Sequence, residues 1–392
     1  MGIKNLMKVL SENTPNAISD VKMSELHNSK VAIDTSIIIY QIVTAIRSSG
    51  EDLKGPNGKS TSHIHAILSK TLSYLRNGIT PIHIFDGKPP EIKMKILQDR
   101  LKIKKEAINK LIEINEAEKP IDIDALNLIE DEKIKLLKQS VSISHAEMLE
   151  AQEIVQLLGV PLIQAPEEAD AQCAYLSANN LVNFVATEDM DLLTFGSKIV
   201  IRNFLKKNMC KINLSDVLKD SKLTMDQFID ICILLGCDYT DSIEGIGPKR
   251  AWELIVKYGS IENLIAKDKK IAENKYKLPD NFRYVEARDY FKNHRHTEVK
   301  ETDLILQVPK LNELKKLLID KYGFDENNIE HMIGFLRKRF NIYDQQYVEK
   351  QKQILEKINE EMQKDPFVSD DEAKPKKKSK QKNNIVINSK KK

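Results

Sequence analysis

The sequence predicts an α/β fold in which helices flank a mostly parallel central sheet. Residues 30–87 give an apolar run, a helix over about Ser62–Asn77 and a second apolar run, which is the order of a βαβ unit. Three further apolar runs, GVPLIQAP, NLVNFVAT and KIVIRNF, follow between residues 159 and 204, separated by helical or polar stretches. Strands that alternate with helices are typical of a parallel sheet covered on both faces.

A helical segment interrupts the predicted sheet and divides the chain into regions. Between residues 89 and 158, Lys, Glu, Ile and Leu recur at helical spacing, with a break at residues 120–124. Residues 224–265 have the pattern of a helix, a tight turn and a helix. We therefore expect a first sheet region (1–105), a helical insertion (106–145), a second sheet region that includes the helical pair (146–340) and a charged, partly disordered tail (341–392).

Acidic residues stand where the predicted strands end, which points to a divalent-metal site. In an open α/β sheet, ligands bind beyond the carboxyl ends of the strands. Hard divalent cations prefer oxygen ligands, and two such ions can activate water and stabilise the leaving oxygen of a phosphodiester. We therefore expect two magnesium ions in a site for phosphodiester hydrolysis. The candidate ligands are Asp34, Asp86, Glu168, Asp170, Asp189, Asp191 and Asp238.

Two pairs among these acids are separated by a single residue. Asp189 and Asp191 point the same way if the TEDMD segment is extended. Pro166 suits the first position of a helix, which would place Glu168 and Asp170 together in its first turn. Taken singly, any of the acids is better explained as a solvated charge, or as a partner of a helix dipole worth roughly 0.3 to 1 kcal/mol. It is the joint pattern that favours a metal site.

The first half of the helical segment is locally cationic. Between Lys93 and Lys110 there are seven basic residues and two acids. Lys93 and Arg100 are seven residues apart, which on a helix places them on one face about 10.5 Å apart along the axis. They could straddle a scissile phosphate and stabilise developing charge. A solvated face with surface ion pairs is the alternative explanation.

The segment GIGPKRA is the second strong local signal. Gly245 and Gly247 allow close backbone approach, and Pro248 suits the first position of a helix. The helix start can bind phosphate through exposed N–H groups. Lys249 and Arg250 add positive charge. Such contacts grip a duplex backbone without reading bases. The alternative is a plain helix-turn-helix packing motif.

Composition excludes a membrane protein and limits the argument from charge. The chain has 41% hydrophobic and 30% charged residues, and no apolar run approaches the roughly 18 residues that span a bilayer. The net charge is +3, but residues 369–392 hold nine lysines and three acids, which leaves the rest at −3. Nucleic-acid binding must therefore come from local patches. We read no targeting signal at the start of the chain, and the four cysteines fit a reducing compartment.

Seven motifs now make the sequence recognisable. They are MGIKNL, VAIDTSIIIYQ, FDGKPP, APEEADA, ATEDMDLLTFG, ILLGCDY and GIGPKRA. With these motifs in this order, residues 1–340 resemble the flap endonucleases, a family of XPG/Rad2-like structure-specific 5′ nucleases. The resemblance implies a PIN/5′ nuclease-like fold, a helical arch at residues 90–145 through which a single-stranded 5′ flap threads, and a helix-hairpin-helix that holds duplex DNA.

The resemblance also implies roles for individual residues. The seven acids match the metal ligands of the family, and Lys93 and Arg100 match its catalytic cations. Tyr40 matches its stacking aromatic. By chemistry alone, a tyrosine near the junction of a strand and a helix usually serves to pack the core. The implied DNA contacts are Arg47, Lys70, Glu168, Gly236, Asp238, Gly245, Gly247, Lys249 and Arg250. A potassium ion would be bound by main-chain carbonyls near Ser242, Ile243 and Ile246.

Two departures from the family pattern bear on specificity. Asp170 stands where flap endonucleases usually have Glu, and EADAQCAYL is similar to the exonuclease branch of the superfamily. After Phe340 there is no Gln-x-x-aliphatic-x-x-aromatic-aromatic box, so the sequence does not support binding to a sliding clamp.

The sequence therefore predicts a monomeric, magnesium-dependent enzyme that cleaves 5′ flaps at the junction with duplex DNA, with 5′–3′ exonuclease activity, in replication and long-patch repair. A 5′–3′ exonuclease acting on duplex ends, an inactive junction-binding scaffold and an RNA-cleaving nuclease are the alternatives. The segment KPKKKSKQK is compatible with nuclear import, and equally with a nonspecific DNA-binding arm.

Overall fold

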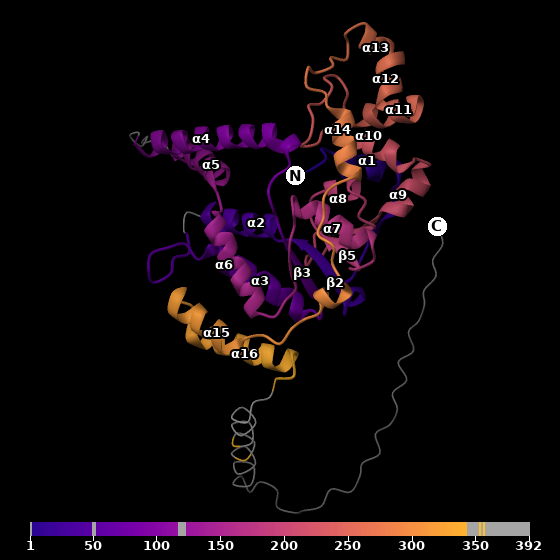
Figure 1. Cartoon of the computed structure of the whole chain (residues 1–392). Coiled ribbons are helices and arrows are strands. Elements are labelled where there is room, and N and C mark those ends of the chain that lie inside the picture. Colours follow the sequence, from indigo (N-terminus) through magenta and orange to yellow (C-terminus); the bar gives the residue numbers. More distant parts are fainter. Residues whose placement is uncertain (1, 49–51, 117–122, 343–352, 354–355, 357–392) are drawn as a thin grey trace, which may run out of the picture. The chain divides into compact units, whose positions relative to one another are not determined.

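A seven-stranded sheet organises the part of the chain that ends at Phe340 (Figure 1). The structure is a computed structural model that describes residues 2–48, 52–116, 123–342, 353 and 356. Almost all of the predicted charged, partly disordered tail (341–392) lies outside this range. The strands are β1 (Ile18–Asp20), β2 (Lys30–Asp34), β3 (Thr80–Phe85), β4 (Leu162–Gln164), β5 (Phe184–Ala186), β6 (Ile199–Arg202) and β7 (Cys210–Asn213).

The strand order is β1-β7-β6-β5-β2-β3-β4. The five strands from β6 to β4 are parallel, with Val31 of β2 opposite Phe184 of β5 and Pro81 of β3. Strands β7 and β1 add an antiparallel edge. The predicted α/β class with a mostly parallel sheet is therefore confirmed. The antiparallel edge was not predicted, because β1 and β7 are too short to give a clear pattern.

Helices cover the sheet, as the near-continuous apolar strands require. In β2, Val31 and Ile33 pack in one core cluster with Tyr74, whereas Ala32 packs in another with Leu192 and Ile231. Consecutive residues of one strand thus enter two cores, because side chains alternate across the pleat. The helices are α1 (Leu6–Asn13), α2 (Thr35–Ser48), α3 (Ser62–Arg76), α4 (Met94–Glu116), α5 (Ile123–Ser140), α6 (His145–Leu157), α7 (Ala169–Ala178), α8 (Asp191–Thr194), α9 (Leu214–Ser221), α10 (Met225–Leu235), α11 (Pro248–Tyr258), α12 (Ile261–Lys267), α13 (Lys269–Ala272), α14 (Tyr284–Lys292), α15 (Leu311–Lys316) and α16 (Glu326–Arg339).

The helical insertion consists of α4 and α5, which lie side by side (Figure 1). They pack on each other through Ala107, Leu111 and Leu136, a small cluster separate from the two sheet cores. The predicted boundary at residue 106 falls inside α4. Most of the predicted break at residues 120–124 lies outside the described residues. No described helix is long and apolar enough to cross a membrane.

An ion triad joins the predicted helical pair to α14. Arg288 of α14 contacts Asp230 of α10 at 2.7 Å and Glu262 of α12 at 2.7 Å. Asp230 is 2% exposed and also accepts a hydrogen bond from the main-chain N–H of Ile261. Burial raises the pKa of Asp230, and Arg288 opposes that rise. The triad thus holds three helices together around one buried charge.

We expect Arg288→Met to lower the free energy of unfolding by about 3 to 5 kcal/mol, because it leaves the Asp230 charge buried and unpaired. Chemical denaturation of the whole chain measures this. The control is Glu262→Gln, which removes a half-exposed partner and is expected to cost less than about 1 kcal/mol. Equal losses for the two variants would contradict this account of the triad.

Candidate active site

All seven predicted acids line a single cavity of about 250 Å³. The cavity lies at the carboxyl edge of the parallel strands, next to the point where the chain order reverses between β2 and β5. Crevices of open α/β sheets form at such reversals. The cations Lys93 and Arg100 line the same cavity. The structure therefore brings together residues that lie up to about two hundred positions apart in the sequence.

The first two acids are placed directly by strand ends. Asp34 is the last residue of β2, and its Oδ1 accepts a hydrogen bond of 3.0 Å from the N–H of Ile37 in α2. Asp86 follows β3, and its Oδ1 accepts a hydrogen bond of 2.9 Å from the N–H of Ala169. Asp86 thus also interacts with the start of α7. An interaction with a helix end was the alternative explanation for a single acid in the sequence analysis.

Glu168 and Asp170 lie at the start of α7, but Pro166 does not begin this helix. The helix starts at Ala169, with Glu168 immediately before it and Asp170 in its first turn. The expectation for Pro166 was therefore wrong by three positions, because the segment before Glu168 stays outside the helix. The outcome for the acids is the same, since both reach the cavity.

Asp189 and Asp191 do not form an extended pair. Asp191 is the first residue of the short helix α8, and its N–H donates a hydrogen bond of 3.0 Å to Oδ1 of Asp189. The chain turns here instead of continuing β5, so the alternation argument was wrong for this segment. Both side chains are nevertheless buried in the wall of the cavity, at 6% and 3% exposure.

Burial and crowding make this cluster costly to keep charged. Burial, followed by the charge of Asp86, raises the pKa of Asp34. Burial, followed by Asp189, likewise raises the pKa of Asp170 and of Asp191. Desolvation and like charges both disfavour the ionised form. The cavity therefore needs positive charge to hold its acids ionised.

The insertion supplies part of that charge. Lys93, at the end of the turn before α4, contacts Glu168 and lies 3.4 Å from Oδ2 of Asp238. Nη2 of Arg100, on α4, lies 2.6 Å from the same oxygen. Burial alone would lower the pKa of Lys93, but the two carboxylates raise it above its usual range. Lys93 is thus held as a cation beside the acids.

The acids fit hard divalent cations. Oδ1 of Asp170 and Oδ1 of Asp191 are buried in the cavity wall without a hydrogen-bond partner. Unpaired buried carboxylate oxygens are rare unless a cation completes them, and the donor set is entirely oxygen. As they stand, no three acids, histidines or cysteines in the described ranges converge on one ready-made ion site. Lys93 and Arg100 instead hold Glu168 and Asp238.

Two tyrosines that the sequence analysis missed hold Glu168. The hydroxyl of Tyr239 donates to Oε2 of Glu168, and that of Tyr290 lies 3.5 Å from the same atom. Tyr239 follows Asp238 in the GCDY motif, so its position was a signal that could have been used. Tyr290 lies on α14, far away in sequence, and nothing in its local sequence indicates the contact.

Gly2 was also missed, although it belongs to the MGIKNL motif. It has φ +73°, and a Cβ at this position would lie 1.8 Å from Oδ1 of Asp189 and 2.5 Å from Oδ1 of Asp191. The chain start thus packs directly against the two acids, and only a residue without a side chain fits.

The three dispersed DNA-contact candidates are placed differently from one another. Tyr40 lies on α2 and is 37% exposed. Lys70 of α3 lines a smaller cavity that shares Asp34 with the first, and burial, followed by Lys206, lowers its pKa. The guanidinium of Arg47 is engaged within the chain. Their contacts with DNA stay predictions.

The predicted hairpin forms, with α10 and α11 as its helices. Pro248 is the first residue of α11, as predicted, and Lys249 on that helix is 84% exposed. Arg250 donates a hydrogen bond of 2.9 Å to the carbonyl of Gly245. Gly247 immediately precedes α11 and is exposed, as is Lys249, and the start of a helix of this kind favours an anion.

The turn of the hairpin contains the other candidates. Gly236 ends α10 with φ +107° and accepts a hydrogen bond from the N–H of Lys4 at 3.3 Å. Ser242, Ile243 and Ile246 lie in the irregular segment before α11, where the N–H of Ile246 donates to the carbonyl of Ile243 at 3.4 Å. The potassium site stays a prediction.

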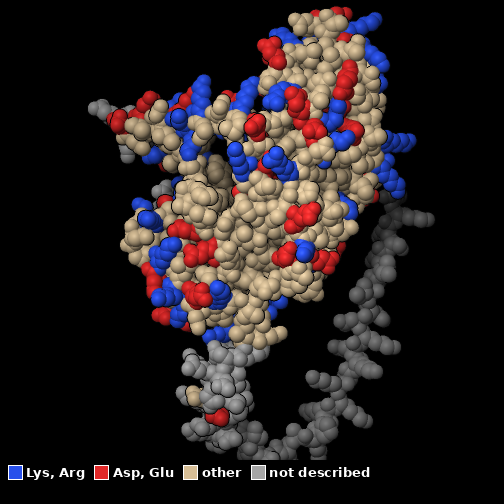
Figure 2. All heavy atoms as spheres, viewed as in Figure 1, with Lys and Arg blue, Asp and Glu red and all other residues tan. Residues whose placement is uncertain are grey.

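In the view of Figure 2, the surface is hollowed between α4 and the body of the protein, and Lys and Arg side chains gather over α4. Helix α4 carries six of the seven basic residues counted above, and the seventh, Lys93, directly precedes it. The basic first half of α4 therefore borders the hollow, as a polyanionic substrate requires.

The chain is similar to proteins of known family and structure. Residues 1–107 match the XPG N-terminal domain, and residues 159–238 match the XPG I-region. The chain is 39% identical to "Flap endonuclease 1" of Plasmodium chabaudi chabaudi over all of this chain and 84% of that protein. It is similar to the solved flap endonuclease-1 of Methanococcus jannaschii, with 28% identity, a TM-score of 0.61 and coverage of 82% of this chain and 96% of that one. The catalytic core of Rad2, solved with DNA substrate, shares the fold with a TM-score of 0.63 and 23% identity over 86% of this chain and all of that one.

The parallel sheet, with acids along its carboxyl edge and the two XPG regions, places the chain among the XPG-type nucleases. Within that class, the chain belongs to the flap endonuclease 1 family.

We expect Gly2→Ala to reduce nuclease activity by about tenfold or more, because the new methyl group displaces Asp189 and Asp191 and small misplacements in a site are costly. Gly58→Ala is the matched control, since Gly58 has φ +74° and open space around it. Cleavage rates and melting temperatures of both variants measure the difference. If both variants lose activity equally, backbone strain and not the clash is responsible.

We expect Tyr239→Phe to lower the cleavage rate by about tenfold, because it removes a hydrogen bond that orients Glu168 while the ring stays packed against Phe195 and Phe291. Tyr175→Phe serves as the control, since its ring stacks on His296. The measurement is the single-turnover cleavage rate. A rate for Tyr239→Phe equal to that of the wild type would contradict a role of Tyr239 in orienting Glu168.

Proposed function

We propose that the protein is a structure-specific endonuclease that cleaves 5′ flaps at the junction of single-stranded and duplex DNA. The observation that supports this most directly is the single cavity that gathers the seven acids, Lys93 and Arg100 beside a helical insertion whose first half is locally cationic. Membership of the flap endonuclease 1 family supports the choice of substrate.

The acids and the two cationic side chains of the cavity would have different chemical roles. The cavity acids would hold two divalent cations, for which magnesium is our proposal, and these ions when bound would supply water activation and stabilisation of the leaving oxygen. In the structure, the side chains of Lys93 and Arg100 contact Glu168 and Asp238, two of the proposed metal ligands. Both side chains therefore already lie where a phosphate diester would enter. Their charge would stabilise the negative charge that develops on the phosphate.

The remaining surfaces would place the substrate. Lys249, Arg250 and the start of α11 would grip the phosphates of a duplex, with a potassium ion bound by main-chain carbonyls near Ser242, Ile243 and Ile246. Tyr40, Lys70 and Gly236 would contact DNA nearer the cavity. A flap that passes beneath α4 and α5 would bring its junction to the acids.

We further propose a role in replication and long-patch repair, as a monomer in the nucleus. The basic tail supports the location, although it lies outside the described residues. The chain offers no recognisable clamp-binding box after Phe340, and we propose no sliding-clamp partner.

We expect the wild type, in magnesium, to cut a 5′ flap at its junction and to leave a nick that a ligase can seal. Asp189→Ala is expected to lose activity by about 10²-fold or more, since even outer partners of metal ligands contribute 10 to 100-fold. The control Asp220→Ala removes an acid from the exposed surface of α9. Unchanged activity of Asp189→Ala would contradict the site.

The same substrates separate the alternatives. Because Asp170 stands where flap endonucleases usually have Glu, the cleavage rates on matched flap, gapped and recessed-end DNA should be compared. Faster cleavage of the recessed end would identify a 5′–3′ exonuclease. Tight flap binding without turnover would identify a scaffold, and preference for an RNA flap would identify an RNA nuclease.

A further inference from the structure

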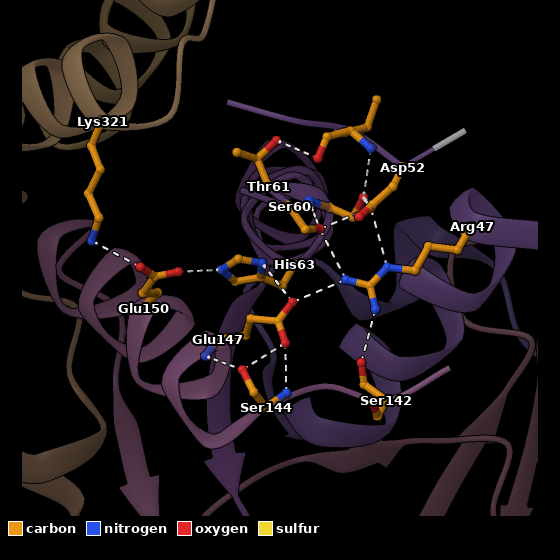
Figure 3. Close-up of polar contacts among 12 residues, drawn as sticks. Arg47, Asp52, Ser60, Thr61, His63, Ser142, Ser144, Glu147, Glu150 and Lys321 are labelled. Atoms are coloured by element: carbon orange, nitrogen blue, oxygen red, sulfur yellow. Dashed lines mark hydrogen bonds and ion pairs between the residues drawn. The ribbon is translucent and has the colours of Figure 1, made fainter. Parts of the chain in front are cut away.

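The side chain of Arg47 is engaged entirely with its own protein. Nε donates to Asp52 at 3.2 Å, Nη1 to the carbonyl of Ser142 at 2.9 Å, and Nη2 to Ser60 at 3.0 Å and to Glu147 at 3.1 Å (Figure 3). The side chain is 21% exposed. We call this set of five residues the Arg47 junction. A guanidinium whose fork is filled in this way has little donor capacity left for another partner.

The junction fastens the point at which the insertion returns to the body. Helix α5 ends at Ser140 and α6 begins at His145, so Ser142 lies in the short link between them. Glu147 belongs to α6 and forms a capping box with Ser144, which fixes the start of that helix. Arg47 itself is in the last turn of α2, the helix that begins directly after Asp34. One side chain therefore joins the link to the helix that leads from the cavity.

Neighbouring contacts hold the junction from two further sides. Asp52 also accepts hydrogen bonds from Ser60 and Ser62, at 2.9 and 2.7 Å, which orders the segment before α3. On α6, Glu150 contacts the fully buried His63 at 2.8 Å and Lys321 at 3.1 Å (Figure 3). Asp52 is thus held by two serines as well as by Arg47, and α6 is held through Glu150 as well as through Glu147.

Apolar packing and the Arg47 junction act together at this end. The buried cluster of the insertion consists of Ala107, Leu111 and Leu136, which join α4 to α5. On the returning side, α5 packs against α2, and Val141 in the link is buried. Segments with little buried apolar contact open easily, so their position depends on the polar contacts at their ends. At the other end of the insertion, Lys93 and Arg100 reach the cavity acids.

We propose that Arg47 is a positioning residue that fixes the returning end of the insertion and thereby sets the positions of Arg100 on α4 and of Lys93 directly before it. This differs from the direct DNA contact that the family resemblance implies for Arg47. Its consequence for cleavage rests on the proposed function, whereas its consequence for the insertion does not.

Hydrogen exchange of the full chain without DNA tests the mechanical part. We expect Glu147→Gln and Arg47→Lys each to speed exchange in the described parts of α4 and α5 by about tenfold, while β2, β3 and β5 keep wild-type rates. Lys59→Gln is the control, since it removes an exposed cation from the same segment as Ser60. Wild-type exchange of α4 and α5 in both variants would overturn the proposal, whatever the enzyme cleaves.

Single-turnover kinetics on a 5′ flap test the catalytic part. A positioning role predicts that Glu147→Gln lowers the maximal rate by about tenfold with little change in flap affinity, because Lys93 and Arg100 are misplaced. A DNA-contact role predicts the opposite: loss of this acid leaves the rate unchanged and leaves affinity equal or higher, because a negative charge beside the DNA is gone. The second result would overturn the proposal, and failure of the wild type to cut flaps would instead count against the proposed function.

Discussion

The structure depends on the electrostatic balance between buried acids at the carboxyl edge of the sheet and cations that the insertion brings to them. Parallel strands present their ends at one edge, and the reversal between β2 and β5 opens a crevice there. Burial and mutual repulsion raise the pKa values of Asp34, Asp170 and Asp191. Lys93 and Arg100 offset part of that cost. The insertion is therefore electrostatically part of the site, although its own buried cluster is separate from those of the sheet.

Arginine side chains that bridge two acids hold the elements around this site. Arg288 joins α14 to α10 and α12, and the same α14 carries Tyr290 to Glu168. Arg47 joins α2 to the link after α5 and to α6. A planar fork with several donors can fix an orientation that one ammonium group cannot. Each of the two proposed DNA-binding parts, the hairpin and the insertion, thus has an arginine that adds a fixed polar contact to its apolar packing.

The sequence revealed the parts of the site that follow from local patterns. Asp34 and Asp86 were predictable because each ends an apolar run whose strand type is clear, and Pro248 was predictable because its ring suits a helix start. The turn at Asp189 and the late start of α7 after Pro166 depend on packing that no short window contains. Tyr290 lies about a hundred residues from Glu168, and Arg47 lies about as far from Ser142 and Glu147, so only the folded chain shows these contacts.

The central claim is that Lys93 acts on the reacting phosphate from within the acidic cavity. Single-turnover cleavage of a 5′ flap by Lys93→Met, with flap affinity measured in calcium, tests it most directly. The account predicts a fall in rate of about 10²-fold with affinity unchanged, as expected when a group stabilises charge mainly in the transition state. A wild-type rate with weakened binding would contradict it, because Lys93 would then serve only to attract DNA.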